Sequence, residues 1–354
     1  MPSAEPFAQL QERSPLVVPV IVHVVWHTVG EHVSDEIIVS QLEALNRDFN
    51  AQNLDLDEIP EEFQDRIANL EISFCLASKT PFGQPTNGIL RVRTTVDAIG
   101  IKDSLFFDST GGSSAWDTER YLNIWVANTG GLISGFGSFP GLVPPYKDGV
   151  IINPKYFGQN GHAKYGLGRT LVHETGHYFG LKHVWASDPL CETDDGIEDT
   201  PKQQYRHIGC PSYPQKSCTD SDMFMNFMDY VDDPCMLLFT AGQKEKIWAN
   251  IELFRPKLLS NDVEYYCLHA NQKKDFGFKI TPNPTFGAFR ITLEQTGVLA
   301  EIQIFDALGN LRKQLNVITN QELEIDTEGM EPGVYFVQVL SRSGKASAKL
   351  LVLE

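Results

Sequence analysis

Four apolar runs in the first half of the chain have the pattern of β-strands. The run Leu16–Trp26, LVVPVIVHVVW, is continuous rather than alternating, which is typical of a strand buried on both faces. Shorter runs at Leu70–Ala77, Tyr121–Ala127 and Gly149–Ile152 predict three more strands, and a glycine-rich loop follows the run that ends at Ala127.

Helical patterns separate and follow these runs. Ser34 can cap a helix, because the apolar residues after it repeat at helical spacing as far as Phe49. The stretch 166–179 also has helical character and ends at Gly180, and a third helix is expected over Ala241–Phe254 after a long loop region. A strand, a helix and a further strand in succession indicate an α/β layer.

The pattern changes near residue 268, where a polar stretch, LHANQKKDFG, has the composition of a linker. Short alternating runs follow at a spacing of about 8–12 residues, which is typical of a small β-sandwich. These runs are Phe289–Leu293, Ala300–Phe305, Glu322–Ile325, Val334–Leu340 and Lys349–Leu353. The expected organisation is an N-terminal extension at 1–15, a catalytic domain at 16–267, a linker at 268–280 and a β-sandwich at 281–354.

Composition narrows the class of protein. The 354 residues are 42% hydrophobic and 21% charged, which is typical of a globular chain. The net charge of −17 argues against nucleic acid and anionic membranes as partners. Residues 271–354 hold 9 basic and 10 acidic side chains, so the first 270 residues hold 20 of the 29 basic and 36 of the 46 acidic ones. No apolar run reaches the roughly 18 residues that a transmembrane helix needs.

Four of the six cysteines lie within 45 residues of a loop-rich stretch, and none forms a close pair of the zinc-knuckle type. Two disulfides are therefore the preferred interpretation, and they require an oxidising compartment. The chain begins MPSAEPFAQLQERS, without the features of a signal peptide. We therefore expect a secreted or cell-surface protein whose signal segment is absent from this chain.

The sequence HETGHYFGLKH at 173–183 carries the strongest chemical signal. His173 and His177 are four residues apart and project from one face of a helix, where they can share a metal ion. Gly180 can end the helix and turn the chain so that His183 becomes the third ligand. Three protein ligands leave the fourth position of a tetrahedral zinc ion open, and Glu174 lies beside that position as a general base. The motif is typical of the metzincin peptidases.

Three further segments accompany this motif: LNIWVAN at 122–128, DGIEDTP at 195–201 and NFMDYVDDPCM at 226–236. With them, residues 16–255 resemble the pappalysin family of metzincin endopeptidases, particularly its small bacterial members. Val184 follows the third histidine, where an astacin has glutamate. The resemblance implies an α/β (α+β) zinc protease domain with a twisted mixed sheet and backing and active-site helices. The implied activity is hydrolysis of peptide bonds by a zinc-bound water that Glu174 activates.

The resemblance also implies roles for residues outside the zinc motif. Met228 would pack beneath the zinc histidines, and Tyr230 would stabilise the oxyanion. A calcium ion, a second metal of the family, would be bound by oxygen ligands in the loop after the motif. The implied calcium ligands are Asp195, Asp199 and Thr200, and the implied disulfides are Cys191–Cys218 and Cys210–Cys235. Whether Cys75 pairs with Cys267 is open.

Asp232 and Asp233 follow Tyr230 closely, in a segment that forms a wall of the primed-side pocket in metzincins. Small bacterial pappalysins prefer a basic residue just after the scissile bond, and a carboxylate in this pocket would pair with Arg or Lys. Which of the two aspartates faces the pocket is open. With this preference, Lys273 and Lys274 in the linker would be sites of self-cleavage.

Residues 281–354 resemble the C-terminal sorting domain of type IX secretion, a small immunoglobulin-like sandwich that would make the secretion machinery a partner. The matching segments are TPNP, IFDALGN, PGVYFVQV and SGKASAKLLV. A carbohydrate-binding sandwich is the alternative, but it would expose aromatic side chains, and Tyr335 and Phe336 cannot both face solvent on one strand.

Two other functions are compatible with the N-terminal region. The first is a non-catalytic, metal-stabilised adhesion protein on the same fold, which would be free to lose Glu174. The second is a zinc amidohydrolase that acts on small molecules in a closed pocket. Because Glu174 and the three histidines are all present, the sequence favours a secreted zinc endopeptidase with protein or peptide substrates.

Overall fold

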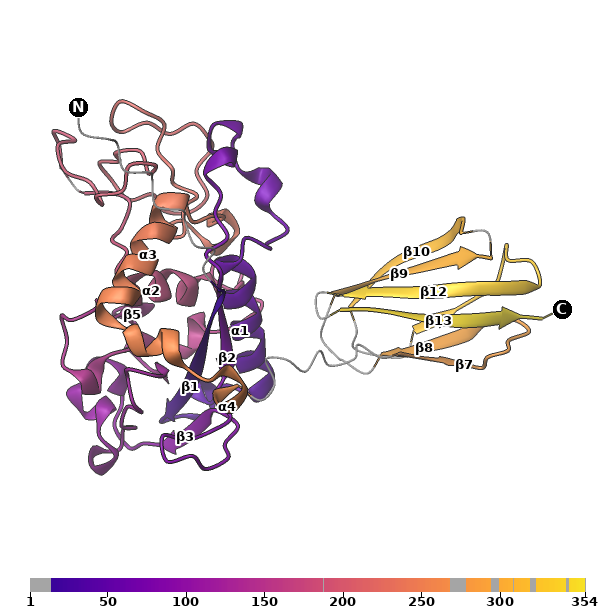
Figure 1. Ribbon diagram of the computed structural model, residues 1–354, viewed down its shortest axis with the longest axis horizontal. Helices are drawn as coiled ribbons and strands as arrows, with labels where there is room; N and C mark the ends of the chain where they lie inside the picture. The colour runs from indigo at the N-terminus through magenta and orange to yellow at the C-terminus, as the bar shows by residue number, and fades with distance from the viewer. Residues whose placement is uncertain are drawn as a thin grey trace, which may run out of the picture. The chain divides into compact units, whose positions relative to one another are not determined.

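The structure is a computed structural model that describes residues 14–186, 188–267, 278–293, 299–307, 309–318, 323–341 and 344–353. The chain divides at residue 268 into two compact units (Figure 1). Each unit has its own hydrophobic core. Most of the expected N-terminal extension and linker, with Lys273 and Lys274, lies outside the described residues.

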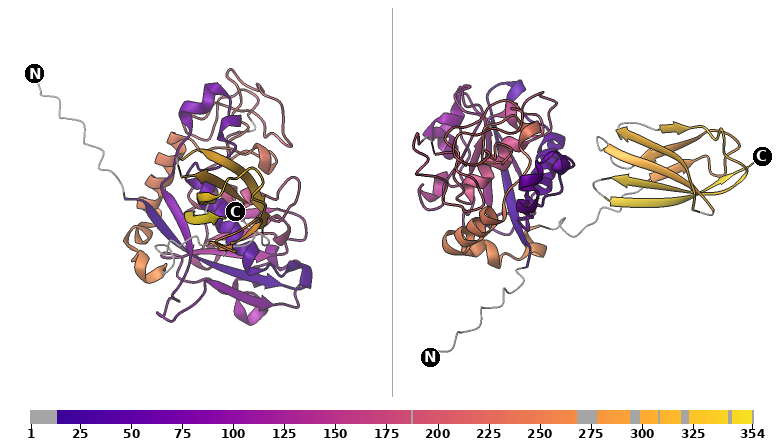
Figure 2. Two further views of the ribbon diagram at one scale, coloured as in Figure 1. Left: turned by 90° about the vertical axis from the view of Figure 1, so that its right-hand side faces the viewer. Right: turned by 90° about the horizontal axis from the view of Figure 1, so that it is seen from above.

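A six-stranded mixed sheet forms the centre of the N-terminal unit (Figure 2). Its longest strand, β1, pairs in parallel with β2 through its first half, with β3 through its second half, and with β4 along its other edge. Strand β6 continues the parallel order beside β4, and β5 is antiparallel at the outer edge. The strands are β1 (Leu16–Trp26), β2 (Ile72–Leu76), β3 (Ile89–Arg93), β4 (Leu122–Ala127), β5 (Gly135–Gly137) and β6 (Val150–Ile152).

The four strands expected from the sequence are present, and two were missed. All but two residues of β1 are fully buried, which explains its unbroken apolar pattern. Strand β3 has no fully buried residue, and β5 consists of only three residues, two of them glycine. Neither missed strand has the apolar run or the length from which a strand can be recognised.

Two helices of this unit contact each other and pack against the sheet. Helix α1 (Asp35–Phe49) begins after Ser34, whose side chain accepts the N–H of Ile37 as a cap. Helix α2 (Arg169–Tyr178) contacts α1, β5 and β6, so it lies at the edge of the sheet that ends in β5. Helices α3 (Ala241–Phe254) and α4 (Val263–Tyr266) complete the unit. In the described parts of the chain, no helix combines the length and the apolar character that a membrane span requires.

Helix α2 begins at Arg169, three residues later than the sequence suggested. Gly168 has a left-handed backbone (φ 79°), and the Asp233 carboxylate accepts the N–H groups of Leu167 and Arg169. A carboxylate from a distant segment therefore caps the N-terminus of α2, where the first N–H groups of a helix lack partners.

The side chain of Arg169 anchors the first turn of α2. It is 1% exposed and donates hydrogen bonds to Asp48 on α1, to Asp55 and to the carbonyl oxygen of Asp233. A buried guanidinium is stable only when its donors and its charge are matched in this way. The network joins the start of α2 to α1 and to the segment that contains Asp233.

Three disulfides are present. Cys191–Cys218 and Cys210–Cys235 link the long loop region between α2 and α3, with the pairing that the family resemblance implied. Cys75–Cys267, which the sequence left open, joins β2 to the end of the N-terminal unit. The region between α2 and α3 has little regular structure. Cys191–Cys218 and Cys210–Cys235 stabilise it by restricting the conformations that it can adopt in the unfolded chain.

The C-terminal unit consists of two antiparallel sheets with the strand orders β10-β9-β12-β13 and β11-β8-β7. Its core includes Tyr335, whereas the neighbouring Phe336 is exposed, as expected for alternate positions on one strand. The strands are β7 (Phe278–Thr281), β8 (Phe289–Leu293), β9 (Leu299–Asp306), β10 (Leu311–Ile318), β11 (Leu323–Ile325), β12 (Gly333–Ser341) and β13 (Gly344–Val352). Strands β7 and β10 were not expected from the sequence.

Candidate metal centre and active site

Three imidazoles converge at the end of α2. His173 and His177 lie one helical turn apart, and His183 follows in the loop after the helix. The Nε2 atoms of His177 and His183 are 3.0 Å apart, and one nitrogen from each of the three rings lies within 4.8 Å of the others. This is the only cluster of three or more potential His, Cys, Asp or Glu ligands among the residues that the structure describes.

The hydrogen bonds of two rings define which nitrogen is free. The Nδ1 of His173 donates to the carbonyl oxygen of Phe227, and the Nδ1 of His177 donates to that of Leu181, both at 2.7 Å. A carbonyl oxygen can only accept, so each Nδ1 carries the proton and each Nε2 keeps a free lone pair. This is the usual arrangement of histidines that bind a metal.

The charge state of the three histidines is also suited to binding a cation. Burial lowers the pKa of His173 well below its ordinary value, lowers that of His177, and lowers that of His183 to about 3, so all three rings are neutral at pH 7. Tetrahedral zinc with bonds of about 2.0–2.1 Å needs ligand nitrogens about 3.3 Å apart, close to the observed separation of His177 and His183. The donor set therefore fits zinc.

The turn between the second and third histidines depends on Gly180. Its φ of 88° lies in the left-handed region, and a Cβ there would lie 2.2 Å from the side-chain nitrogen of Asn250. The N–H of Leu181 bonds back to the carbonyl of Gly176, which closes the helix. The chain then turns towards the cluster, as the sequence predicted for this glycine.

Met228 lies against α2 at the level of the histidines. The residue is fully buried, and its sulfur lies so close to Gly176 that a Cβ on that glycine would be 2.5 Å away. The carbonyl of Met228 accepts the N–H of Val184, and the preceding carbonyl, that of Phe227, holds His173. This segment therefore holds the ring of His173 and the backbone of the residue that follows His183.

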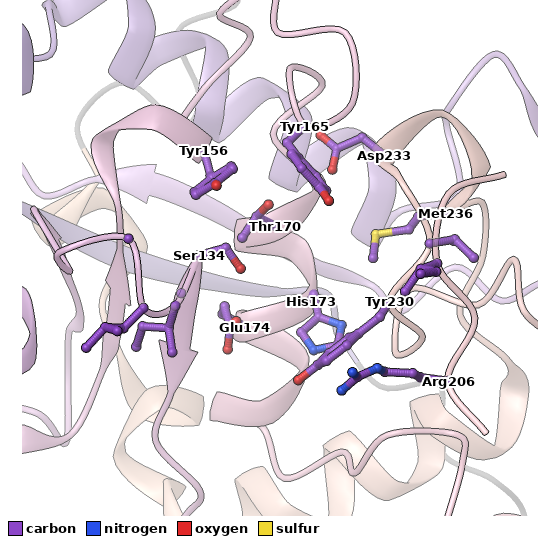
Figure 3. A pocket seen from close by; sticks show the side chains of 16 residues that line it. Ser134, Tyr156, Tyr165, Thr170, His173, Glu174, Arg206, Tyr230, Asp233 and Met236 are labelled. Carbon is purple, nitrogen blue, oxygen red and sulfur yellow. The ribbon is translucent and has the colours of Figure 1, made fainter. Parts of the chain in front are cut away.

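Glu174 lies in the cleft beside His173 (Figure 3). Burial raises the pKa of its carboxyl to about 8, and a hydrogen bond from the backbone of Gly137 on β5 partly opposes this shift. A Cβ added to Gly137 would lie 2.1 Å from the carbonyl oxygen of Glu174, and a Cβ added to Gly135 would lie 2.8 Å from the Cγ of Glu174. The glycines of β5 thus let the strand approach the helix closely enough to hold Glu174.

Tyr230 lies at the same cleft, next to two of the histidines. Its ring centroid is 4.8 Å from that of His183 and 5.5 Å from that of His173. Burial, followed by the charge of Glu174, raises the pKa of its hydroxyl, which keeps the phenol protonated at neutral pH. The buried Asp229 carboxylate accepts the N–H of Tyr230 and so fixes the backbone at this position.

The cleft has a volume of about 530 Å³ and extends from β5 to the segment after Tyr230. Asp233 lines it and is 1% exposed, and its Oδ1 has no hydrogen bond partner in the described structure. Asp232 does not line the cleft and instead forms an ion pair with Lys164. The structure therefore places Asp233 at the cleft and Asp232 away from it, a distinction that the sequence left open. The other polar or aromatic residues around Asp233 are Tyr156, Tyr165 and Thr170 (Figure 3).

Comparison with known proteins agrees with this geometry. Residues 107–252 match the family described as pregnancy-associated plasma protein-A. The structure of mirolysin in complex with compound 9 is 39% identical, with a TM-score of 0.68, and the match covers 72% of this chain and 98% of that chain. The chain belongs to the pappalysin family. Mature mirolysin of Tannerella forsythia in complex with a cleaved peptide is also 39% identical, with a TM-score of 0.64 and coverage of 70% and 99% of the two chains.

Several curated relatives of this pappalysin are extracellular metalloproteases. One from Arthroderma otae is 34% identical over 157 residues, which is 42% of this chain and 58% of the relative. One from Arthroderma gypseum is 30% identical over 223 residues, 61% of this chain and 65% of the relative. The chain thus spans little more than half the length of the curated relatives that match first. Residues 279–353 match the secretion system C-terminal sorting domain. Extracellular relatives and a sorting domain indicate a secreted or cell-surface protein.

The three expected calcium ligands of the pappalysin do not all face one point. Asp195 is buried, and both its oxygens accept the Thr200 hydroxyl. The Asp199 carboxylate instead accepts the Thr240 hydroxyl and the N–H of Gly242 at the start of α3. Asp199 therefore caps α3 in this structure, whereas Asp195 and Thr200 remain a pair of adjacent oxygen groups. Burial raises the pKa of Asp195 to about 6, and the hydrogen bonds from Thr200 and Ile197 partly oppose this shift.

Sequence reasoning missed three parts of the site. Strand β5 was hidden in a glycine-rich loop, and Arg206 and Trp185 lie in loops without a recognisable motif. Arg206 lines the cleft and lies over the Tyr230 ring, 5.8 Å from its centroid. Trp185 stacks on His183. Its position two residues after the third histidine was the one available signal.

We predict that Gly137→Ala destabilises the N-terminal unit by about 1–3 kcal/mol, the usual cost of overpacking. The new methyl group would overlap the Glu174 carbonyl, so β5 and α2 must separate. Gly30→Ala is the matched control, because a Cβ there meets nothing within 4 Å. Urea unfolding of the two variants and the unmodified protein measures the difference. Equal midpoints for all three proteins would show that β5 is not packed as described.

Proposed function

We propose that this protein is a zinc-dependent endopeptidase. The observation that carries the proposal is the cluster of three neutral imidazoles with Glu174 beside it, in an open cleft. Membership in a family of metalloproteases supports it. The cleft is lined in part by the exposed Leu132 and Ile133 just before β5, so it is open to solvent and an extended peptide can enter. A small-molecule amidohydrolase would need a closed pocket.

Zinc held by His173, His177 and His183 would supply a Lewis acid that polarises the scissile carbonyl and acidifies water. In this proposal, Glu174 accepts a proton from the attacking water and later donates it to the leaving amine. Burial raises the pKa of Glu174 in the metal-free protein, and the charge of a bound zinc ion would oppose this shift and favour the carboxylate that the base requires. The Tyr230 hydroxyl, protonated at neutral pH, would donate a hydrogen bond to the oxyanion.

Glu174→Gln tests the catalytic role, because glutamine keeps the shape of the side chain but cannot accept a proton. We expect the variant to retain its zinc content and thermal stability and to lose activity on a peptide library by about 10²-fold or more, the scale of general acid–base catalysis. Tyr230→Phe should lose about 10²-fold, the scale of one oxyanion donor. Zinc content by atomic absorption and cleavage by mass spectrometry are measured on the same samples.

If Glu174→Gln cleaves as well as the unmodified protein, the assignment of the general base is wrong. If the unmodified protein binds zinc but cleaves no peptide in the library, the non-catalytic binding protein becomes the better description.

We propose further that the enzyme prefers Arg or Lys immediately after the scissile bond, and that Asp233 recognises this residue. One oxygen of Asp233 caps α2, whereas the other is buried without a partner in a residue that contributes to the cleft wall. A buried acceptor without a partner is costly, and a guanidinium or ammonium group would relieve that cost. The charge of Arg169 is shared among Asp48, Asp55 and the Asp233 carbonyl, so it does not replace this partner.

Asp233→Asn is a suitable test because an amide oxygen can still accept the two N–H groups at the start of α2. We expect the preference for Arg or Lys at the first primed position to fall by about 10²-fold, since a charged hydrogen bond contributes about 1.5–3 kcal/mol. Asp232→Asn is the control, because Asp232 pairs with Lys164 outside the cleft. Cleavage-site profiling measures both variants, and a profile rich in apolar residues that neither variant changes would refute the proposal.

We propose that calcium binds the loop after the zinc motif through Asp195 and Thr200. Asp195 is a buried carboxylate with a raised pKa, and its neighbour Thr200 offers a second oxygen. Calcium prefers such hard oxygen ligands, supplemented by carbonyl groups of the loop. Asp199 is left out of this proposal because its carboxylate is engaged at the start of α3.

Calcium removal should lower the thermal stability, because a ligand that binds only the folded state stabilises it. Asp195→Asn should make the melting temperature independent of added calcium, whereas Asp220→Asn, in the same loop region, should leave the calcium response unchanged. Differential scanning fluorimetry over a calcium titration with constant zinc measures the effect. An unmodified protein whose melting temperature does not respond to calcium would contradict the proposal.

We propose that the C-terminal unit directs the chain to the type IX secretion machinery. The match to a secretion sorting domain supports this partner. The unit's small core is consistent with a handle. Among its described residues, the large aromatic side chains exposed to solvent are Phe286 and Phe336, which offer little of the stacking surface that a carbohydrate site needs.

A further inference from the structure

The three candidate zinc ligands do not have equivalent surroundings. His173 and His177 each donate Nδ1–H to a backbone carbonyl oxygen, which fixes both the tautomer and the orientation of the ring. In the described structure His183 has no such acceptor, because its only hydrogen-bond-length contact is between its Nε2 and that of His177. Something else must therefore fix the ring of His183.

The side chain of Trp185 occupies the position of this missing support. Its ring centroid lies 4.1 Å from that of His183, and the two planes are 6° apart, so the rings are stacked face to face. This is the closest and most nearly parallel ring pair in the described structure. An indole face in this position prevents the imidazole from rotating away from the other two ligands.

The same indole also contacts Tyr230. The Trp185 and Tyr230 centroids are 4.6 Å apart with planes at 70°, and Tyr230 meets His183 edge-on at 4.8 Å. The three rings therefore contact one another. The Tyr230 hydroxyl has no hydrogen bond in the described structure, and the side chain is 41% exposed. Its position consequently depends on ring contacts, with Arg206 over the ring as a further neighbour.

The backbone of Trp185 is held independently of its side chain. Trp185 forms a parallel bridge with Gln203, and the next residue, Ala186, donates its N–H to the Gln203 carbonyl. The Gln203 side chain in turn donates to Asp229, which accepts the N–H of Tyr230. Removing the indole should therefore leave the path of the chain intact while it frees the two rings.

We propose that Trp185 is a positioning residue that holds His183 in the orientation for metal binding and Tyr230 in its place over the cleft. Its stacked ring fixes the orientation of His183, as hydrogen bonds to backbone carbonyl oxygens fix those of His173 and His177. The inference rests on the proposed zinc site, but its first test does not require that the protein cleaves peptides.

The test measures zinc affinity by competition with a chromophoric chelator. Trp185→Leu and Trp185→Met remove the flat ring, and we expect both to weaken zinc binding by about 10–100-fold, the usual effect of losing an outer support of a metal ligand. Trp185→Phe keeps an aromatic face and should recover most of the affinity. Trp116→Leu is the matched control, because Trp116 packs with Tyr121 in a separate cluster away from the histidines.

Thermal unfolding of the zinc-free proteins separates this role from a general loss of packing. Because Trp185 also packs against the main core, we expect the zinc-free Trp185→Leu protein to be folded but less stable than the unmodified protein. The stability that it gains on zinc addition should also be smaller than the gain of the unmodified protein. Affinities of the Leu and Met variants equal to that of the unmodified protein would overturn the inference. An unmodified protein that binds no zinc would instead overturn the zinc site itself.

A second measurement addresses Tyr230. In peptide cleavage at saturating zinc, Trp185→Leu should lower kcat when Tyr230 is present. In the Tyr230→Phe background it should have little further effect on kcat, because the hydroxyl that Trp185 positions is already absent. Equal effects in both backgrounds would show that Trp185 does not act through Tyr230.

Discussion

The structure of the site depends on how the segment 226–236 braces α2. The Phe227 carbonyl holds His173, the Met228 side chain packs on Gly176, and the Asp233 carboxylate caps the first turn. One stretch of chain thus contacts the helix at its start and along its middle. The disulfide from Cys235 and the bond from Arg169 to the Asp233 carbonyl fix this stretch in turn. Two ligands on a helix and a third in a loop can converge only if the helix cannot slide relative to this segment.

Sequence reasoning recovered the parts of this arrangement whose chemistry is local. The spacing of the histidines, the turn at Gly180 and the buried strand β1 follow from helical geometry, positive φ and burial on both faces. It could not recover contacts whose partners are distant along the chain. Asp233 illustrates this difference. Its place in the sequence suggested that it lines a specificity pocket. Its hydrogen-bond donors, the N–H groups of Leu167 and Arg169, are 66 and 64 residues away along the chain. Likewise, β5 could not be recognised because two of its three residues are glycines, which permit the close contact with Glu174 but weaken the sequence pattern of a strand.

Asp233 combines two demands that oppose each other. As a cap it must be ionised and buried at the start of α2, and burial raises its pKa to about 6. The N–H groups of Leu167 and Arg169 favour the ionised form, but they satisfy only one of its oxygens. The folded state therefore carries an acceptor that is buried without a partner, which costs stability. Such a cost in the wall of an open cleft is typical of functional sites, where a ligand supplies the missing partner.

The supports of the three histidines differ because their backbones differ. His173 and His177 lie on a helix whose neighbours present carbonyl oxygens at defined positions, so a hydrogen bond can hold each ring. His183 lies in a loop beside the open side of the cluster, where Tyr230 must also fit. An aromatic face can hold a ring there without consuming a hydrogen bond, and it also offers an edge to the tyrosine. The helix side of the centre is thus fixed by hydrogen bonds and the loop side by stacked rings. The loop side of the centre thus joins His183 and a tyrosine from another segment through ring contacts, which depend less strictly on direction than hydrogen bonds do.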